Sequence, residues 1–222
     1  MTAVNNGPLV WSHLEESFRS LYGGCVIAGG SVRDWEHDQT IKPKDFDVFV
    51  PVDDDFDFDI RFWSLPFDGK RYAPKKSHYS GASDWHEVLG VGYCNVPDVP
   101  SVVNVIGRSR EKIADPSLLM QDFDHSLCQF WWDGKRVLRT AAARESMETG
   151  QIKSFRDGDP RTSTRITELK YRQGYDRYLP KLTGLKPRKL NLPPMWGSGS
   201  DLLYPGQTTT LQNYAQRFAN LI

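Results

Sequence analysis

The chain has 222 residues, of which 39% are hydrophobic and 12% aromatic, a composition that supports a packed core and excludes disorder throughout. Its 28 Lys and Arg residues balance 28 Asp and Glu residues. The field of the whole molecule therefore does not attract nucleic acid, and a polyanion-binding surface has to be local. Residues 108–188 are basic and the start of the chain is acid-rich, which places such a surface in the second half.

The cysteines and the terminal sequence indicate the compartment. Cys25, Cys94 and Cys128 lie far apart without a CxxC spacing, so a zinc site or a disulfide framework is not expected and a reducing compartment fits. The first residues show no secretory signal, and no apolar run is long enough to cross a membrane. We expect a soluble, cytoplasmic protein with no membrane partner.

Apolar periodicity and turn residues predict the elements in chain order. Helices are predicted over residues 11–22, from near Ser31, from the cap candidates Asp53 to Asp55 up to about Leu65, and over 141–149, 164–173 and 209–221. Strands are predicted over residues 25–28, 45–51, 87–95, 102–106, 127–132 and 135–138. The polar stretch 68–83 is predicted to be a loop, and Asp133-Gly134 a two-residue hairpin turn.

The end of the chain is rich in proline and glycine. We expect residues 1–178 to form one domain and residues 179–222 to form an irregular extension that packs on it.

Two aspartates flank a phenylalanine at the start of the strand predicted over residues 45–51. Because side chains alternate across a strand, Asp45 and Asp47 share one face, roughly 6.6 Å apart. Phe46 and Val48 then point to the opposite, buried face. Two carboxylates on one face are suited to binding a divalent metal ion. A solvated strand end would also explain the pair when it is taken alone.

A glycine turn precedes this strand. Gly29, Gly30 and Ser31 stand between a short strand and a helix start, where free backbone amides can bind an anion and Arg33 adds a positive charge. A tight turn without a ligand is the alternative. The turn matches neither the P-loop nor the dinucleotide-binding fingerprint.

In this order, the two motifs resemble the head domain of class II tRNA nucleotidyltransferases and bacterial poly(A) polymerases, within the nucleotidyltransferase superfamily. The matching residues are Gly29, Gly30, Val32, Arg33, Asp34, Asp45 and Asp47. The resemblance implies that the two glycines line a triphosphate site. It also implies that Asp45 and Asp47 are the catalytic metal ligands, holding two Mg²⁺ ions or Mn²⁺ in their place. Small stand-alone proteins of this pattern resemble those of tailed bacteriophages.

Two later segments extend the resemblance. Asp124 opens a segment similar to the family's Asp-Phe-Thr-Ile-Asn, although a strand-entry cap explains it equally well. Asp159-Pro160 begins a helix-like stretch with Arg165 and Arg172, which lie two helical turns apart and so share a face. Arginines placed there could bind a triphosphate bidentately, and a solvated basic face is the alternative. We therefore count Asp124, Arg165 and Arg172 as nucleotide-binding candidates.

The chain departs from the family at three points. Nothing after Tyr175 reproduces the base-reading Glu-Asp-x-x-Arg element, Asn104 stands where a third carboxylate could be expected, and the helical domains that measure tRNA are missing. The acidic run Asp53 to Asp59 lacks the glycine and glutamate of a calcium loop and is better explained by helix capping.

The resemblance implies an α+β fold of the nucleotidyltransferase (polymerase β-like) type, with a short, mixed, mostly antiparallel sheet and helices on one side. The implied reaction transfers NMP from an NTP, with ATP or CTP favoured, to a hydroxyl acceptor and releases pyrophosphate. An RNA 3′ end, tRNA first, is the favoured acceptor. A protein side chain or a small molecule, and a non-catalytic nucleotide-binding role, remain open.

Overall fold

The computed structural model describes residues 7–72, 88–156 and 159–171. The extension predicted for residues 179–222 and the helix predicted over residues 209–221 lie outside these ranges. Within them, no helix is both long enough and apolar enough to span a membrane.

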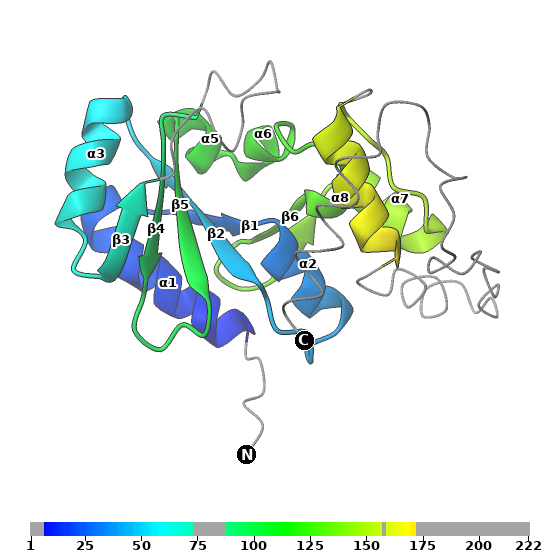
Figure 1. Cartoon of the computed structure of the whole chain (residues 1–222), viewed down its shortest axis with the longest axis horizontal. Coiled ribbons are helices and arrows are strands. Elements are labelled where there is room, and N and C mark those ends of the chain that lie inside the picture. The colour runs from blue at the N-terminus through cyan, green and yellow to red at the C-terminus, as the bar shows by residue number, and fades with distance from the viewer. Residues whose placement is uncertain (1–6, 73–87, 157–158, 172–222) are drawn as a thin grey trace, which may run out of the picture. The chain divides into compact units, whose positions relative to one another are not determined.

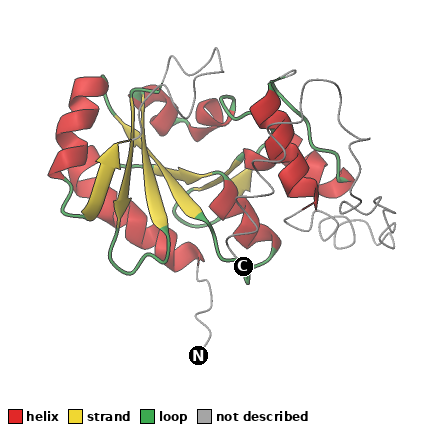
Figure 2. Cartoon of the chain, viewed as in Figure 1, coloured by secondary structure: helices red, strands yellow, loops and turns green. Residues whose placement is uncertain are grey.

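The described part combines helices with one seven-stranded sheet (Figures 1 and 2). The helices are α1 (Gly7–Tyr22), α2 (Gly30–His37), α3 (Asp55–Ser64), α5 (Arg110–Ala114), α6 (Pro116–Met120), α7 (Ala141–Thr149) and α8 (Pro160–Tyr171), with a 3₁₀ turn η2 (Ser126–Cys128). The strands are β1 (Val26–Ala28), β2 (Asp45–Pro51), β3 (Asp68–Tyr72), β4 (Gly90–Asn95), β5 (Val102–Arg108), β6 (Phe130–Trp132) and β7 (Val137–Arg139).

The strand order is β3-β4-β5-β2-β1-β6-β7, and Figure 1 shows it from left to right as far as β6. Only β2 and β5 pair in parallel, and every other neighbouring pair is antiparallel. The expected α+β fold with a mixed, mostly antiparallel sheet is therefore confirmed.

The larger core lies on the face of the sheet that α1 and α3 cover. Helix α1 buries Trp11, Leu14, Phe18 and Tyr22, which recur at helical spacing, and it ends at Gly23 in a left-handed conformation. The rings of Phe58 and Phe62 on α3 stack with centroids 5.6 Å apart over the strands. Gly90 and Gly92 of β4 allow this close approach, because a Cβ at either position would collide with those rings.

A smaller apolar cluster lies on the opposite face. There Phe49, Val91 and Ile106 pack against Leu119 and Met120 of the short helix α6. The sequence did not predict α5 and α6. The expected placement of helices on one side therefore describes α1 and α3, and these two short helices cover part of the second face.

Strand register aligns residues from five strands on this second face. Tyr93 of β4 pairs with Asn104 of β5, and Asn104 pairs with Asp47 of β2. Asp47 pairs with Ala28 of β1, and Ala28 pairs with Trp131 of β6. Directly paired residues point to the same side of a sheet, so this lateral row surrounds Asp47 with defined neighbours.

Some predicted boundaries hold and others do not, since helices α1 and α8 each begin four residues before their predicted starts. Strand β2 and helix α7 have the predicted bounds. Part of the predicted 68–83 loop is strand β3, because its backbone pairs with β4. The predicted hairpin is present, because β6 pairs antiparallel with β7, but its two-residue turn at Asp133-Gly134 is wrong. Four residues separate the two strands, and the Asp133 side chain accepts from the amides of Lys135 and Arg136 within this longer loop. Residues 126–128 form the 3₁₀ turn η2 instead of strand.

Candidate active site

Asp45 and Asp47 project from β2 on the face opposite α1 and α3. The burial pattern alternates at the start of the strand, where Phe46 and Val48 are fully inside the larger core and the two aspartates are half-buried. The predicted arrangement of two carboxylates on one face is therefore present in the structure.

Asn104 fixes the orientation of Asp47. Its Nδ2 donates to Asp47 Oδ1 over 2.9 Å, across the parallel pairing of β5 with β2. The residue that stands in place of an expected third carboxylate thus lies beside the aspartate pair, as the sequence predicted, and serves there as a hydrogen-bond donor.

The pKa of Asp47 is raised from its ordinary 3.8 to about 6. Desolvation is the main cause and the charge of Asp45 adds to it, while the hydrogen bond from Asn104 and the charge of Arg165 act in the opposite direction. Two partly desolvated carboxylates that repel each other form a site that a divalent cation would stabilise.

The glycine turn lies directly against Asp47. Gly29 has φ 89° and ψ −143°, a conformation that side chains disfavour, and it caps the N-terminus of α2. A Cβ on Gly29 would lie 3.1 Å from Asp47 Oδ2 and 3.5 Å from Phe123. The bare backbone of Gly29 therefore allows the carboxylate and the start of α2 to lie in contact.

The first turn of α2 contains Gly30, Ser31 and Arg33, which the sequence analysis predicted to bind an anion. The opening amides of a helix have no acceptor within it, and here they begin at Gly30 beside the aspartates. Among the residues that the structure describes, the buried Ser31 Oγ has no hydrogen-bond partner, which is unusual for a buried hydroxyl. An incoming phosphate oxygen is one group that could satisfy it.

Arg33 is buried beneath the turn. Its guanidinium pairs with Asp34 at 2.6 Å and also donates to the Leu127 carbonyl over 3.4 Å. One guanidinium nitrogen would lie 3.6 Å from a Cβ on Gly30, so its charge lies close to the turn. Arg33 thus connects α2 to η2 and places a positive charge close to Gly30.

Asp124 and Arg165 meet on the other side of the site. Arg165 donates to Asp124 Oδ2 over 2.8 Å and to Cys128 Sγ over 3.2 Å, while its side chain stays 41% exposed. Its charge reaches Asp47, whose pKa it lowers. The structure therefore brings these two predicted residues together near the aspartates, whereas Arg172 lies outside the described residues.

The buried group of Asp124, His125 and Cys128 has the residue types of a metal site. Its ligand atoms lie within 4.8 Å of one another. However, the Arg165 guanidinium already binds the carboxylate and the sulfur, and burial raises the pKa of the Cys128 thiol to about 11. A metal ion bound to these three residues would be repelled by the positive charge of Arg165. We therefore assign the cluster to anchoring Arg165.

No family model and no curated protein sequence matches the chain. Two of its solved structural neighbours are CCA-adding enzymes. One, in complex with CTP, is 14% identical with a TM-score of 0.46, over 69% of this chain and 35% of that chain. Another, in complex with ATP, is 15% identical with a TM-score of 0.49, over 75% of this chain and 41% of that chain. This chain thus spans less than half the length of either enzyme.

Sequence reasoning did not single out Tyr93 or Trp131. Both lie in the lateral row with Asp47, on either side of it. Alternation within a strand predicts which face a residue occupies, but only the register between strands shows which residues become neighbours.

Proposed function

We propose that this chain is a metal-dependent nucleotidyltransferase that transfers NMP from an NTP, ATP or CTP, to the 3′ hydroxyl of an RNA. The observation that carries the proposal is the close approach of Asp47, one of the paired aspartates of β2, to the bare backbone of Gly29 at the start of α2. It brings a cation-binding pair and an anion-binding turn together, as a metal–triphosphate complex requires.

Asp45 and Asp47 fit a site for Mg²⁺, with Mn²⁺ as a substitute. Hard divalent cations take carboxylate oxygens, and desolvation together with the charge of Asp45 raises the pKa of Asp47, so a bound cation would stabilise its ionised form. When bound, such ions would neutralise charge on the triphosphate and acidify the acceptor hydroxyl.

The turn and Arg165 would hold the phosphates. The amides at Gly30 and Ser31 point outward from a helix N-terminus, and the unsatisfied Ser31 hydroxyl adds a donor. Arg165, anchored by Asp124, offers a partly exposed guanidinium for charge that develops on the leaving group.

The reaction is an in-line displacement. The acceptor oxygen bonds to the α-phosphorus while the bond from that phosphorus to the α–β bridging oxygen breaks. The bridging oxygen leaves with the electron pair as part of pyrophosphate, and the hydroxyl proton passes to water. Asn104 keeps Asp47 in place during this exchange by its hydrogen bond to Oδ1.

Incubation with each labelled NTP and Mg²⁺, first with total RNA and then with a protein extract, tests the proposal. We expect label in the RNA. Asp45→Asn and Asp47→Asn should each lower transfer at least about 100-fold without unfolding, because each removes a charged ligand and leaves an amide of the same shape. Asp59→Asn, an exposed position on α3, is the matched control.

Label in the protein pool alone would refute the RNA acceptor. Full activity of both site variants would refute the metal assignment. If neither pool is labelled and no NTP raises the melting temperature, the chain is not a nucleotidyltransferase.

A further inference from the structure

The acceptor has to approach Asp47 from a definable side. In an in-line displacement, the attacking oxygen and the leaving pyrophosphate lie on opposite sides of the α-phosphorus. The glycine turn, which would hold the leaving phosphates, follows β1 on one side of β2. If the proposed function holds, the acceptor therefore enters over β5 and β4, on the other side of β2.

Tyr93 is the one aromatic residue within strands β4 and β5. It is directly paired with Asn104, which is directly paired with Asp47, so Tyr93 lies two strands from the aspartate on the same face. At the usual strand spacing this separation is about 10 Å, roughly the size of one nucleotide. The ring is half-buried, so part of it faces outward.

One arginine lies over this ring, and the charge of a second reaches its hydroxyl. The guanidinium of Arg71, an exposed residue on β3, lies 5.4 Å from the centroid of the Tyr93 ring. The charge of Arg161, at the start of α8, also acts on the Tyr93 hydroxyl, as do those of Asp45 and Asp47. One aromatic ring with an arginine over it thus lies on the same face as Asp47, two strands away, and the charge of Arg161 reaches its hydroxyl.

Such a combination is suited to a single-stranded nucleic acid. Bases stack on aromatic rings and on guanidinium planes, and arginines bind the phosphates that join them. A peptide acceptor would need neither a stacking surface nor paired cations at this distance from the catalytic carboxylates. The chemistry of the group therefore favours RNA over protein.

We propose that Tyr93, Arg71 and Arg161 form the acceptor subsite, in which the terminal base of a single-stranded RNA 3′ end stacks on Tyr93 and Arg71 while Arg161 binds the adjoining phosphate. The subsite extends the proposed function by assigning residues to the acceptor. In the alternative, the Arg71–Tyr93 contact only holds the edge strand β3 on β4, and loss of the ring would affect stability alone.

Binding of a short, unstructured, 5′-labelled oligoribonucleotide to the full chain separates these explanations. Tyr93→Leu should weaken binding roughly 5- to 150-fold, the range for loss of one stacked base, and should raise the KM for RNA without changing the KM for NTP. Tyr93→Phe, which keeps the ring, should bind as the parent does.

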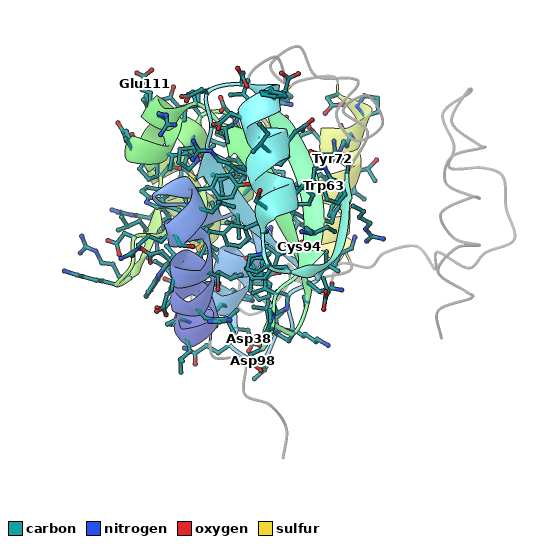
Figure 3. All side chains as sticks on the ribbon, turned by 90° about the vertical axis from the view of Figure 1, so that its left-hand side faces the viewer. Asp38, Trp63, Tyr72, Cys94, Asp98 and Glu111 are labelled. Carbon is teal, nitrogen blue, oxygen red and sulfur yellow. The ribbon has the colours of Figure 1, made fainter. Side chains whose placement is uncertain are left out.

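Tyr72→Leu is the matched control. Tyr72 is the next residue after Arg71 on β3, but it points to the opposite face, where it contacts Phe62 and Trp63 of α3. Figure 3 shows Tyr72 beside Trp63. Tyr72→Leu removes an aromatic ring from the strand next to β4 without changing the proposed subsite. It should therefore lower the stability and leave the affinity for RNA unchanged.

The arginines are tested by RNA affinity and its salt dependence. Arg161→Gln should reduce the slope of log affinity against log salt by about 0.7, the value for one phosphate contact on a single strand, whereas Arg71→Gln should weaken binding through loss of a stacking guanidinium. Arg19→Gln, an exposed arginine on α1 across the sheet, should leave the slope unchanged. These exposed changes keep the test valid if Tyr93→Leu fails to fold.

The outcomes distinguish the two proposals. If the parent transfers NMP but Tyr93→Leu and both arginine variants leave RNA affinity and KM unchanged, the subsite is wrong and the proposed function stands. If Tyr93→Leu weakens NTP binding as much as RNA binding, the ring belongs to the nucleotide site and the subsite is also wrong. If the parent binds RNA through Tyr93 but transfers nothing, the proposed function fails while the binding surface stands. A parent chain that binds no RNA overturns the subsite.

Discussion

Two constraints exclude a side chain at position 29: the backbone conformation of Gly29 and the close approach of the Asp47 carboxylate. Its φ of 89° disfavours any Cβ, and a Cβ there would also press on Asp47 Oδ2 at 3.1 Å. Gly29→Ala should therefore cost about 1–3 kcal/mol of stability and, by displacing Asp47, lower transfer roughly 10- to 100-fold. Thermal melts and steady-state assays measure the two effects separately.

Gly23→Ala provides the matched comparison for this glycine. Gly23 also has positive φ, at 78°, but a Cβ there would meet nothing within 4 Å. It should lose stability and keep its activity once folded. If Gly29→Ala shows the same behaviour, the contact with Asp47 has no role in catalysis.

At the residue scale, the site was predictable where local chemistry determined it. Asp45 and Asp47 were found because two carboxylates two apart on a strand must share a face, and Gly29 because a glycine pair between strand and helix signals an unusual turn. The buried pairing of Arg33 with Asp34 was not visible, since it depends on the packing of α2 against η2. Tyr93 was missed because its position depends on the register of three strands.

At the scale of single elements, helix α3 begins with a reciprocal cap. Asp54 accepts from the Asp57 amide over 2.7 Å, and the Asp57 carboxylate accepts from the Asp53 amide over 3.1 Å. Capping, proposed from the sequence in place of calcium binding, therefore explains these aspartates. Asp57 also pairs with Arg61 one turn later.

Removing this cap should destabilise the protein without changing its chemistry. Asp54→Ala should cost about 1 kcal/mol, because the Asp57 amide loses its acceptor at the helix start. Asp54→Asn, which keeps an oxygen acceptor, should retain most of the stability. Urea denaturation measures both, and transfer by either folded variant should match the parent. A loss of activity with intact stability would contradict the assignment of Asp54 to the cap.

Elements with a strong apolar period were predicted well and weak ones were not. Helix α1 and strand β2 carry clear patterns, so their type was right, as was the extent of β2, while α1 begins four residues before its predicted start. Strand β3 reads Asp-Gly-Lys-Arg-Tyr and is mostly exposed, so only its backbone pairing with β4 defines it. Helices α5 and α6 have five residues each, too few to show a period.

At the scale of the whole molecule, the two faces of the sheet have different tasks. One face carries the large aromatic core under α1 and α3, which contributes most of the apolar burial. The other carries a smaller apolar cluster next to half-buried carboxylates and exposed arginines. Stability and the proposed chemistry are thus assigned to opposite faces, so site substitutions can be made with limited cost to the fold.

This separation makes the titration of Asp47 observable in the stability of the whole protein. Folded Asp47 keeps its proton up to about pH 6, whereas its ordinary pKa is 3.8, so between these values the folded state binds more protons than the unfolded state. The resulting stabilisation is fully present below about pH 3.8 and is lost as pH rises through about 6. His125 acts in the opposite direction, because burial lowers its pKa to about 3 and only the unfolded state takes its proton near neutrality.

Comparison with Asp47→Asn isolates the aspartate, because both proteins contain His125. In metal-free buffer, the melting temperature of the parent minus that of Asp47→Asn should increase as pH falls from about 8 to about 5, since asparagine does not titrate. Adding Mg²⁺ at the higher pH should raise the melting temperature of the parent and leave that of the variant nearly unchanged. A temperature difference that stays constant with pH would show that Asp47 is well solvated, and the repulsion from Asp45 that motivates a cation site would then be absent.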